Sequence, residues 1–362
     1  MKKNILIVLA IILGLTACQQ DSSFKVMVNL SNADGKLFIL HHKVDKEFVA
    51  VDSAIMNDAM VTFNLPKSAP HEFYYLAVRG MQQMMTIIPE NSDVSIVGDI
   101  KNPQNIEIIA SSAQSLLNDY NARERELMES MMDIYSQSRS LSPDDTSVLD
   151  SLRLIFNAVQ DELNQYKVDF VKEYADSFVS HYILNDIKRD YSLEEIKSLF
   201  SIFADKESSA LLEEVSQYIS AMERVELGCP FIDFTLATAD GVKVTLSDVV
   251  AQSRLVLVDF WASWCGPCRG ENPHVLNAYN KYHNDGFDVL GVSLDQDEQE
   301  WIGAVAHDGL VWNNVRDIDG SVASDYMVYY IPSNYLIDAN GVIVAKNLRG
   351  EELNNKINEF LK

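Results

Sequence analysis

The sequence is short of cysteine, of basic residues and of long apolar runs, and each shortage argues against a class of protein. Four cysteines cannot hold together a chain of 362 residues, which argues against a disulfide-stapled scaffold. Lysine and arginine number 29 against 53 acidic residues, so we expect no nucleic-acid partner. The net charge of −24 indicates only a well-solvated surface. A hydrophobic fraction of 47% argues against disorder, and the length fits two or three domains.

An apolar run near the N-terminus predicts an export signal. Lys2 and Lys3 precede the run from Ile5 to Leu13, and small residues follow it. This order of charged, apolar and small residues is typical of a secretory signal. A membrane-spanning helix needs about 20 apolar residues, so we do not expect this run to span a membrane.

The segment LTAC at residues 15–18 resembles the bacterial lipobox. This resemblance implies a lipoprotein signal peptide over residues 1–17, lipidation of Cys18, and a tether over residues 18–23. A plain cleaved signal with an incidental cysteine is the alternative. We therefore expect a periplasm-facing protein of the cell envelope, held to the inner or outer membrane by a lipid anchor in an oxidising compartment.

Short alternating runs predict a small all-β accessory domain over residues 24–111, either a sandwich or a meander. At its start, apolar residues alternate with polar ones: Phe24, Val26, Val28 and Leu30. Further strands are expected at Leu37–Leu40, Val61–Leu65, Phe73–Val78, Met84–Ile88 and Val94–Val97. The adjacent His41 and His42 lack a third ligand at a recognisable spacing, so we expect no metal site there.

A scarcity of helix breakers marks the next segment. No glycine occurs between Gly98 and Gly228, and only Pro103 and Pro143 interrupt that interval. We therefore expect an α-helical region over residues 112–227. Within it, apolar residues recur at helical spacing and predict a core or interface stripe: Val148, Leu152, Ile155, Val159, Leu163, Tyr166 and Phe170.

Two local patterns predict where helices begin in this region. Ser142 and Pro143 suit an N-cap and a first helical position, and acidic residues follow them. Ser192 and Glu195 form a capping-box pattern before another apolar stretch. We therefore expect one helix to start at Pro143 and another just after Ser192.

The third region, residues 228–362, alternates strand and helix patterns. Leu255–Phe260 is an almost continuous apolar run, as expected of a central buried strand. A helix over about 265–282, a strand over Phe287–Ser293 and a helix near 298–306 follow it. An Asn340-Gly341 turn then joins two short strands before a final helix. This pattern predicts an α/β domain with a mixed sheet flanked by helices.

The motif Trp264-Cys265-Gly266-Pro267-Cys268 lies where the buried strand gives way to a helix. Free N–H groups and the dipole at a helix N-terminus favour a thiolate, which is the species that attacks disulfides. Cys268 lies one turn after Cys265 and can close a disulfide with it, while Pro267 stiffens the first turn. We therefore predict that Cys265 and Cys268 form a redox-active disulfide.

Three other interpretations of this pair stay open. A static structural disulfide needs neither the tryptophan nor the strand-to-helix context. A zinc site needs two more ligands, and only Cys229 remains once Cys18 carries lipid. An inactive relic that retains the motif is the third. We expect neither a metal nor a cofactor.

The segment VDFWASWCGPC at residues 258–268 resembles the active-site segment of thioredoxins. Residues 228–362 more closely resemble the TlpA/ResA-like branch of membrane-anchored bacterial thiol-disulfide oxidoreductases. The segments that carry this resemblance are CRGENP at 268–273, GVSLD at 291–295, the helical insert around Trp301, and IPSNYLID at 331–338. It implies a thioredoxin-like fold for this region. The β-rich and helical front end is only generically similar to accessory regions in such lipoproteins.

The resemblance also implies a substrate-binding edge. Pro332, after Ile331, matches the family's cis-proline, which exposes neighbouring backbone for pairing with a substrate chain. We therefore expect Trp264, Ile331 and Pro332 to bind substrate. A plain loop proline is the alternative.

Two acidic residues match the family pattern as well. The resemblance makes Cys265 the nucleophile and Cys268 the resolving cysteine. Asp259 matches a buried acid whose raised pKa lets it accept the proton of Cys268, with a strand-end salt bridge as the alternative. Glu271 matches an acid that tunes thiol acidity, or it is a carboxylate on the helix surface.

Two positions depart from related patterns. Cys229 stands where the family usually has a small apolar residue, and it is expected as a buried hydrophobe or as a third exchange partner. Ala262 stands three residues before Cys265, where peroxiredoxin-like enzymes need threonine. This argues against peroxidase chemistry.

The sequence thus predicts an enzyme that reduces substrate-protein disulfides through Cys265 and Cys268. Its partners are disulfide-containing proteins and a membrane electron-donor protein of the thiol-disulfide type. The alternatives are an oxidant or isomerase of the same fold, and a partner-binding or assembly lipoprotein in which this domain is secondary.

Overall fold

The computed structural model describes residues 23–44, 47–58, 60–67 and 72–362. The predicted signal peptide, the predicted lipidation site Cys18 and the predicted tether up to residue 22 lie outside the described residues. The chain divides into two compact units. The first runs to Ile187 and includes Ile202–Ser209, and the second comprises Lys188–Ser201 and Ala210–Lys362.

The N-terminal part of the first unit is a β-sandwich. One sheet has the order β4-β1-β7-β8 and the other β3-β2-β5-β6. Side chains from both sheets share one core that includes Val28, Phe38 and Ile96, because alternate residues of each strand face inward. The strands are β1 (Ser23–Ser31), β2 (Leu37–Val44), β3 (Glu47–Ile55), β4 (Val61–Pro66), β5 (Tyr74–Val78), β6 (Met85–Ile87), β7 (Val94–Asp99) and β8 (Glu107–Ile109), with a 3-10 turn η1 (Pro103–Asn105).

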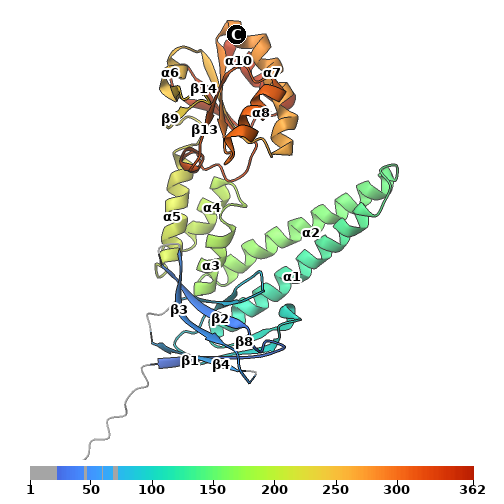
Figure 1. The fold of residues 1–362 in the computed structure, drawn as a ribbon, viewed down its shortest axis with the longest axis vertical. Coiled ribbons are helices and arrows are strands. Elements are labelled where there is room, and N and C mark those ends of the chain that lie inside the picture. Colours follow the sequence, from blue (N-terminus) through green and yellow to red (C-terminus); the bar gives the residue numbers. More distant parts are fainter. Residues whose placement is uncertain (1–22, 45–46, 59, 68–71) are drawn as a thin grey trace, which may run out of the picture. The chain divides into compact units, whose positions relative to one another are not determined.

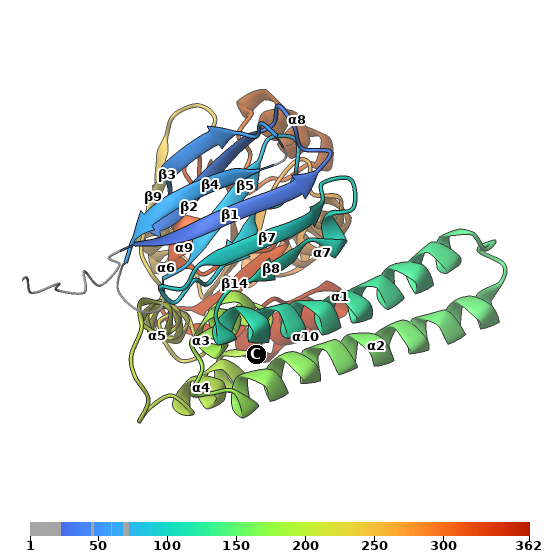
Figure 2. The same ribbon diagram turned by 90° about the horizontal axis from the view of Figure 1, so that it is seen from below.

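Two long helices form a hairpin that projects from the sandwich (Figures 1 and 2). They are α1 (Ser112–Arg139) and α2 (Thr146–Glu173), followed by the short α3 (Phe178–Ile187). Gln114 ties the start of α1 to the sandwich by accepting the backbone N–H of Ile88 at 2.8 Å. The far half of the hairpin keeps apolar side chains exposed, among them Met132 and Leu154.

The predicted helix start at Pro143 is wrong. The helix α2 begins at Thr146, and its N-cap is Asp145, whose side chain makes no capping hydrogen bond. Asp145 instead accepts the backbone N–H of Ser142, which closes a turn ahead of the helix. The prediction at Ser192 is confirmed, because Ser192 and Glu195 exchange the two hydrogen bonds of a capping box.

The second unit contains an α/β domain preceded by two helices. Its helices are α4 (Leu193–Ser201), α5 (Ala210–Glu223), α6 (Leu246–Ala251), α7 (Gly266–Tyr282), α8 (Glu298–Asp308), α9 (Ser321–Asp325) and α10 (Gly350–Leu361), with a 3-10 turn η2 (His283–Asp285). Its strands are β9 (Thr235–Ala237), β10 (Lys243–Thr245), β11 (Leu255–Trp261), β12 (Phe287–Ser293), β13 (Asn313–Arg316), β14 (Ser333–Asp338) and β15 (Ile343–Lys346). The expected α/β domain with a mixed sheet is confirmed.

The sheet of the second unit has the order β10-β9-β13-β12-β11-β14-β15. β11, β12 and β13 run parallel, whereas β14 runs antiparallel to β11. Every residue of β11 is buried, as the apolar run predicted, because helices cover both faces of the sheet. The ends of β11, β12 and β13 therefore meet the beginning of β14 at one edge of the sheet.

Among the described residues, no helix has both the length and the apolar character needed to cross a membrane. The free thiol Cys229 is half-buried, and its Sγ lies 3.2 Å from the carbonyl oxygen of Glu223.

Candidate active site

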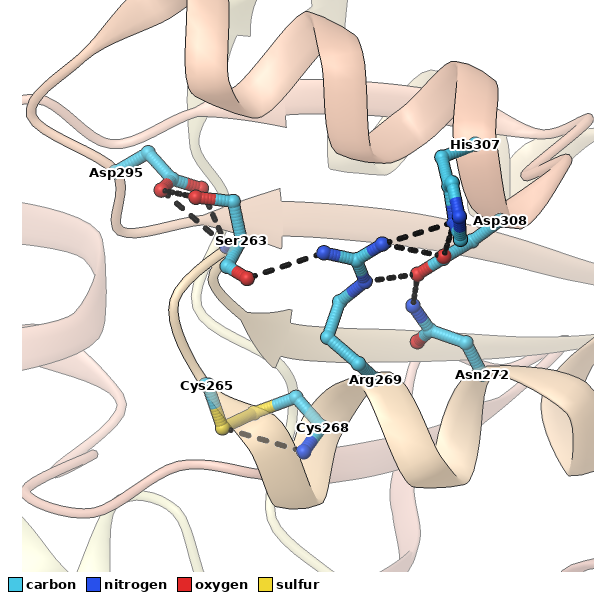
Figure 3. Close-up of polar contacts among 8 residues, drawn as sticks. All are labelled: Ser263, Cys265, Cys268, Arg269, Asn272, Asp295, His307 and Asp308. Atoms are coloured by element: carbon cyan, nitrogen blue, oxygen red, sulfur yellow. Dashed lines mark hydrogen bonds and ion pairs between the residues drawn. A yellow bond between two sulfur atoms is a disulfide. The ribbon is translucent and has the colours of Figure 1, made fainter.

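Cys265 and Cys268 form a disulfide at the start of α7 (Figure 3). Cys265 is the N-cap of the helix, and its Sγ accepts the backbone N–H of Cys268 at 3.2 Å. A proline in the first turn suits this position, because its nitrogen has no helical hydrogen bond to lose. The helix N-terminus thus directs an N–H and the positive end of its dipole at the sulfur of Cys265.

The two cysteines differ from their neighbour Trp264 in accessibility. Both sulfur-bearing residues are buried, whereas Trp264 is 65% exposed. An exposed indole on a rigid turn offers a large apolar contact surface to a partner chain. The structure therefore places an open aromatic contact directly beside a protected disulfide.

The peptide bond between Ile331 and Pro332 is cis, as the resemblance predicted. Pro332 immediately precedes β14, whose Ser333 lies opposite Phe260 of β11. The proline therefore lies at the same sheet edge at which β11 leads into the Cys265 turn. Ile331 is half-buried and packs against the core clusters on both sides of the sheet.

Asp259 is buried within β11, opposite Asn334 of β14. Burial raises the pKa of Asp259 to about 7, although the guanidinium of Arg349 opposes this shift. The nearby negative charge of Glu271 raises the pKa further, and a hydrogen bond from Asn334 lowers it. A carboxyl group with this pKa exchanges a proton readily near neutral pH.

Glu271, on α7, is held by the backbone at the start of the neighbouring helix α10. Its Oε1 accepts the N–H of Gly350 at 2.6 Å, at the N-terminus of α10. Carboxylates are favoured there by the helix dipole. Arg349, the residue before, donates hydrogen bonds to the carbonyl oxygens of Pro332 and Leu348. The structure thus links Glu271 and Asp259 electrostatically, and Arg349 interacts both with Asp259 and with the backbone of the cis-proline.

A polar network beside the disulfide was not predicted from the sequence (Figure 3). Arg269 of α7 donates to both carboxylate oxygens of Asp308 and to the carbonyl oxygen of Ser263, the latter at 3.1 Å. Asn272 also donates to Asp308, at 2.7 Å. Although burial opposes the shift, hydrogen bonds from Arg269, His307 and Asn272 lower the pKa of Asp308 to about 2. The network fixes the turn before Cys265 to the end of α8.

Asp295 holds the same turn from its other side. It accepts hydrogen bonds from the backbone N–H of Ser263, at 2.9 Å, and from the Ser263 hydroxyl. Ser293 also donates to Asp295, at 2.7 Å. Arg269 and Asp295 lie within the segments that carry the family resemblance, which is the signal that could have identified them. Asn334 lies within such a segment as well, at 331–338. Arg349 had no such signal, because only the fold brings it to Asp259.

The comparisons with known proteins concern this same region. The AhpC/TSA family matches residues 227–346. The thiol-disulfide oxidoreductase ResA of Bacillus cereus is 28% identical over 145 residues, which are 40% of this chain and 82% of the relative. ResA of Bacillus subtilis is 26% identical over 139 residues, or 38% of this chain and 76% of the relative.

A solved structure also aligns with the domain. The thioredoxin domain of a thiol-disulfide oxidoreductase from Bacteroides vulgatus is 36% identical, and the alignment covers 38% of this chain and 99% of that one, with a TM-score of 0.36. Residues 227–346 are a TlpA/ResA-like thiol-disulfide oxidoreductase domain. The resemblance drawn from the sequence is confirmed, and so is the thioredoxin-like fold of this oxidoreductase domain.

Proposed function

We propose that this oxidoreductase is a lipid-anchored reductase of disulfides in substrate proteins of the cell envelope, and that it acts through Cys265 and Cys268. The observation that carries the proposal is the Sγ of Cys265 at the N-cap of α7, where it accepts the N–H of Cys268. A thiolate at this position is stabilised, which favours it as the attacking group.

The reaction proceeds through a mixed disulfide. In the reduced enzyme, the Cys265 thiolate attacks one sulfur of the substrate disulfide, forming a new S–S bond and releasing the other substrate sulfur as a thiolate. The Cys268 thiolate then attacks the Sγ of Cys265, which breaks the mixed disulfide and releases the second substrate thiol. Two electrons have passed from the enzyme dithiol to the substrate, and Cys265 and Cys268 are left joined by a disulfide.

Asp259 accepts the proton of Cys268 before this second step. A carboxyl group with a pKa of about 7 is partly ionised at neutral pH, so it can accept a proton and later release it. Glu271 adjusts this proton transfer indirectly, because its charge raises the pKa of Asp259.

The substrate chain binds at the sheet edge that holds Trp264, Ile331 and Pro332. Trp264 is exposed beside the disulfide, and the cis-proline lies at the adjacent strand. A proline has no N–H to donate, so the neighbouring backbone is left for the substrate to pair with.

The location rests on the sequence of the N-terminus. The Lys2-Lys3 start, the apolar run and the lipobox-like LTAC segment support export and lipidation of Cys18. In an oxidising compartment the disulfide has to be reduced again after each turnover. A membrane electron-donor protein of the thiol-disulfide type supplies these electrons.

Trapping of the mixed disulfide tests the proposal. Cys268→Ser leaves the attacking thiol in place but removes the resolving one, so it should accumulate covalent complexes with substrate proteins in envelope extracts. Cys265→Ser serves as the matched control and should trap none. If neither variant traps a partner and the wild-type protein does not reduce insulin disulfides, the proposal is wrong.

A redox titration tests the direction of the reaction. The potential of the Cys265–Cys268 couple is measured by equilibration with glutathione. A value near that of thioredoxin, about −270 mV, is expected for a reductase. A value near −120 mV, typical of a strong oxidant, would reverse the direction of electron flow.

A further inference from the structure

A cavity of about 350 Å³ lies at the carboxyl ends of β12 and β13. Its volume falls within the roughly 300–1,000 Å³ common for binding sites. Leu294, Ile318 and Val328 give it apolar walls, and Asp317 and Asp319 give it an acidic end. We call it the β13 cavity.

The β13 cavity is connected by backbone to the edge that holds the disulfide. The N–H of Leu294, a cavity residue, donates to the carbonyl oxygen of Trp261 at 2.9 Å, at the end of β11. Tyr329, which also lines the cavity, precedes the cis peptide by two residues. The cavity therefore lies at the same edge of the sheet as the active-site turn.

Asp317 is the least expected residue in this lining. It is 1% exposed, and its Oδ2 accepts the N–H of Ala323 at 2.8 Å, whereas its Oδ1 has no hydrogen-bond partner among the described residues. A buried carboxylate oxygen without a donor is costly to leave unpaired. Burial raises the pKa of Asp317, and the interaction with Asp319 raises it further, whereas the interaction with Asp317 lowers the pKa of Asp319. The negative charge of this pair therefore resides mainly on Asp319.

The arginines next to this cavity make contacts other than with Asp317 and Asp319. Arg316 donates to Glu298 at 2.7 Å and to the carbonyl oxygen of Gln296 at 3.3 Å. The guanidinium of Arg189 lies over the ring of Tyr329, 4.3 Å from its centroid. Neither of these contacts neutralises Asp317 or Asp319, so the acidic end of the cavity is suited to a cation from outside.

We propose that the β13 cavity binds a lysine or arginine side chain of the substrate protein, close in sequence to its reacting cysteine. The inference rests on the proposed function. A long aliphatic stem suits the walls formed by Leu294, Ile318 and Val328, and a cationic head suits the acidic end. A metal ion suits the site less well, because no group of three or more His, Cys, Asp or Glu able to hold one occurs within the described residues.

The distance between neighbouring strands indicates how far the basic residue lies from the reacting cysteine in the substrate sequence. β13 is the second strand from β11, and strands lie about 4.8 Å apart, so the cavity is roughly 10 Å along the edge from the strand leading to Cys265. An extended chain covers about 3.3 Å per residue. The basic residue is therefore expected about three residues from the substrate cysteine.

Three matched disulfide peptides test this inference. Each peptide carries the same residue, which is lysine, norleucine or glutamate, about three residues before and about three residues after one cysteine. The peptides are otherwise identical. Pre-reduced full-length protein is mixed with each peptide, and the second-order rate of thiol release is measured in a single turnover. We expect the lysine peptide to react about fivefold faster than the norleucine peptide and the glutamate peptide to react slowest, with smaller differences at high salt.

Asp319→Asn identifies the cavity as the source of the preference. Asp319 is exposed, so this change should not disturb folding. The variant should lose the preference for lysine, so that the lysine and norleucine peptides react with it at similar rates. Asp325→Asn removes the same charge from α9 without touching the cavity, and it should keep the preference.

The outcomes separate this inference from the proposed function. If the wild-type protein reacts with all three peptides at equal rates, the inference is wrong, but the proposed reductase function still holds. A preference that survives in Asp319→Asn, or that disappears when EDTA removes metal ions, would overturn it as well. If the wild-type protein reduces none of the peptides, the proposed function fails and the inference fails with it.

Discussion

Asp259 is a buried residue whose proposed role needs the charged form that burial disfavours. It lies inside a sheet whose surroundings disfavour a charge, and this burial is the main reason why its pKa rises to about 7. Arg349 and Asn334 stabilise the carboxylate form of Asp259, but by less than burial destabilises it, so the pKa of Asp259 stays above its ordinary value. The site therefore holds a group that can gain or lose a proton near neutrality.

The first prediction concerns the pH dependence of the second chemical step. With Asp259 as the proton acceptor, resolution of the mixed disulfide should accelerate as the pH rises through about 7, because the carboxylate form is the active one. Asp259→Asn should slow this step by about 100-fold and remove the inflection near pH 7. Rapid quenching of single-turnover reactions over a pH series measures both effects, and Asp285→Asn, an exposed acid, is the control. An unchanged profile in Asp259→Asn would exclude this role.

The second prediction concerns stability. Because the pKa of Asp259 is raised on folding, its contribution to stability is present below its ordinary pKa of 3.8 and is lost as the pH rises through about 7. The cost of ionising the buried group at alkaline pH is about 4 kcal/mol. Asp259→Asn should therefore stabilise the oxidised protein at alkaline pH and have little effect at acidic pH. Urea unfolding at both extremes checks this, and equal changes at the two would contradict it.

Individual site residues could be predicted from the sequence where they belong to a motif of the family that the sequence resembles. Cys265, Cys268, Asp259 and Pro332 stand at spacings that the family resemblance carries. Arg349 could not be predicted, because it acts on Asp259 only once α10 packs beside β11. Contacts between residues distant in the chain depend on packing that no local pattern records.

Among the secondary-structure elements, the start of α4 illustrates a local rule that held. Ser192 and Glu195 satisfy each other's backbone N–H groups, which otherwise lack partners at a helix N-terminus. We predict that Ser192→Ala lowers the free energy of unfolding by about 1 kcal/mol. Ser198→Ala, at an exposed position in the same helix, should not reduce it. Chemical denaturation measures both variants, and equal effects would argue against the cap.

Other elements were missed for identifiable reasons. β3 escaped prediction because its residues lack the alternation of a half-buried strand, and the structure leaves nearly all of them exposed, including Phe48 and Val51. The short strands β9 and β10 pair over only three residues, too few to produce a periodic signal. The helix start at Pro143 was misplaced because a turn closed by Asp145 competes with the cap. The helical region that holds α1 and α2 was predicted from its scarcity of helix breakers, and β11 was predicted from its continuous apolar run.

At the scale of the whole molecule, the disulfide site lies in one compact unit, and the β-sandwich and helical hairpin lie in the other. The Cys265–Cys268 disulfide and the residues around it lie in the second unit, while the sandwich and the helical hairpin form most of the first. The helices between residues 112 and 227 contribute to both units. The oxidoreductase domain therefore starts structurally before the first residue of its sequence match.

This division predicts that disulfide reduction can be separated from the part of substrate choice that depends on the first unit. A fragment from Ala210 to Lys362 should still reduce a small disulfide such as dithionitrobenzoate at close to the full-length rate. It should keep the preference that the β13 cavity confers, but it should lose any choice among protein substrates that depends on the first unit. It should also be more stable than a fragment starting at Gly228, because Val225 is fully buried and Glu226 pairs with Lys346 at 2.6 Å. Kinetic assays and thermal unfolding of both fragments check these points. Unaltered choice among proteins would show that the first unit is not used for recognition.

The antiparallel pairing of β14 with β11 also constrains how this protein can change over evolution. Asn334 faces Asp259 and Pro332 lies two residues before it, so one register serves both the proton-accepting group and the substrate edge. Side chains alternate between faces along a strand, so inserting or deleting a single residue here would exchange the two faces. The segment from Pro332 to Asp338 therefore tolerates no change of length, because any such change would separate the substrate edge from the proton-accepting group.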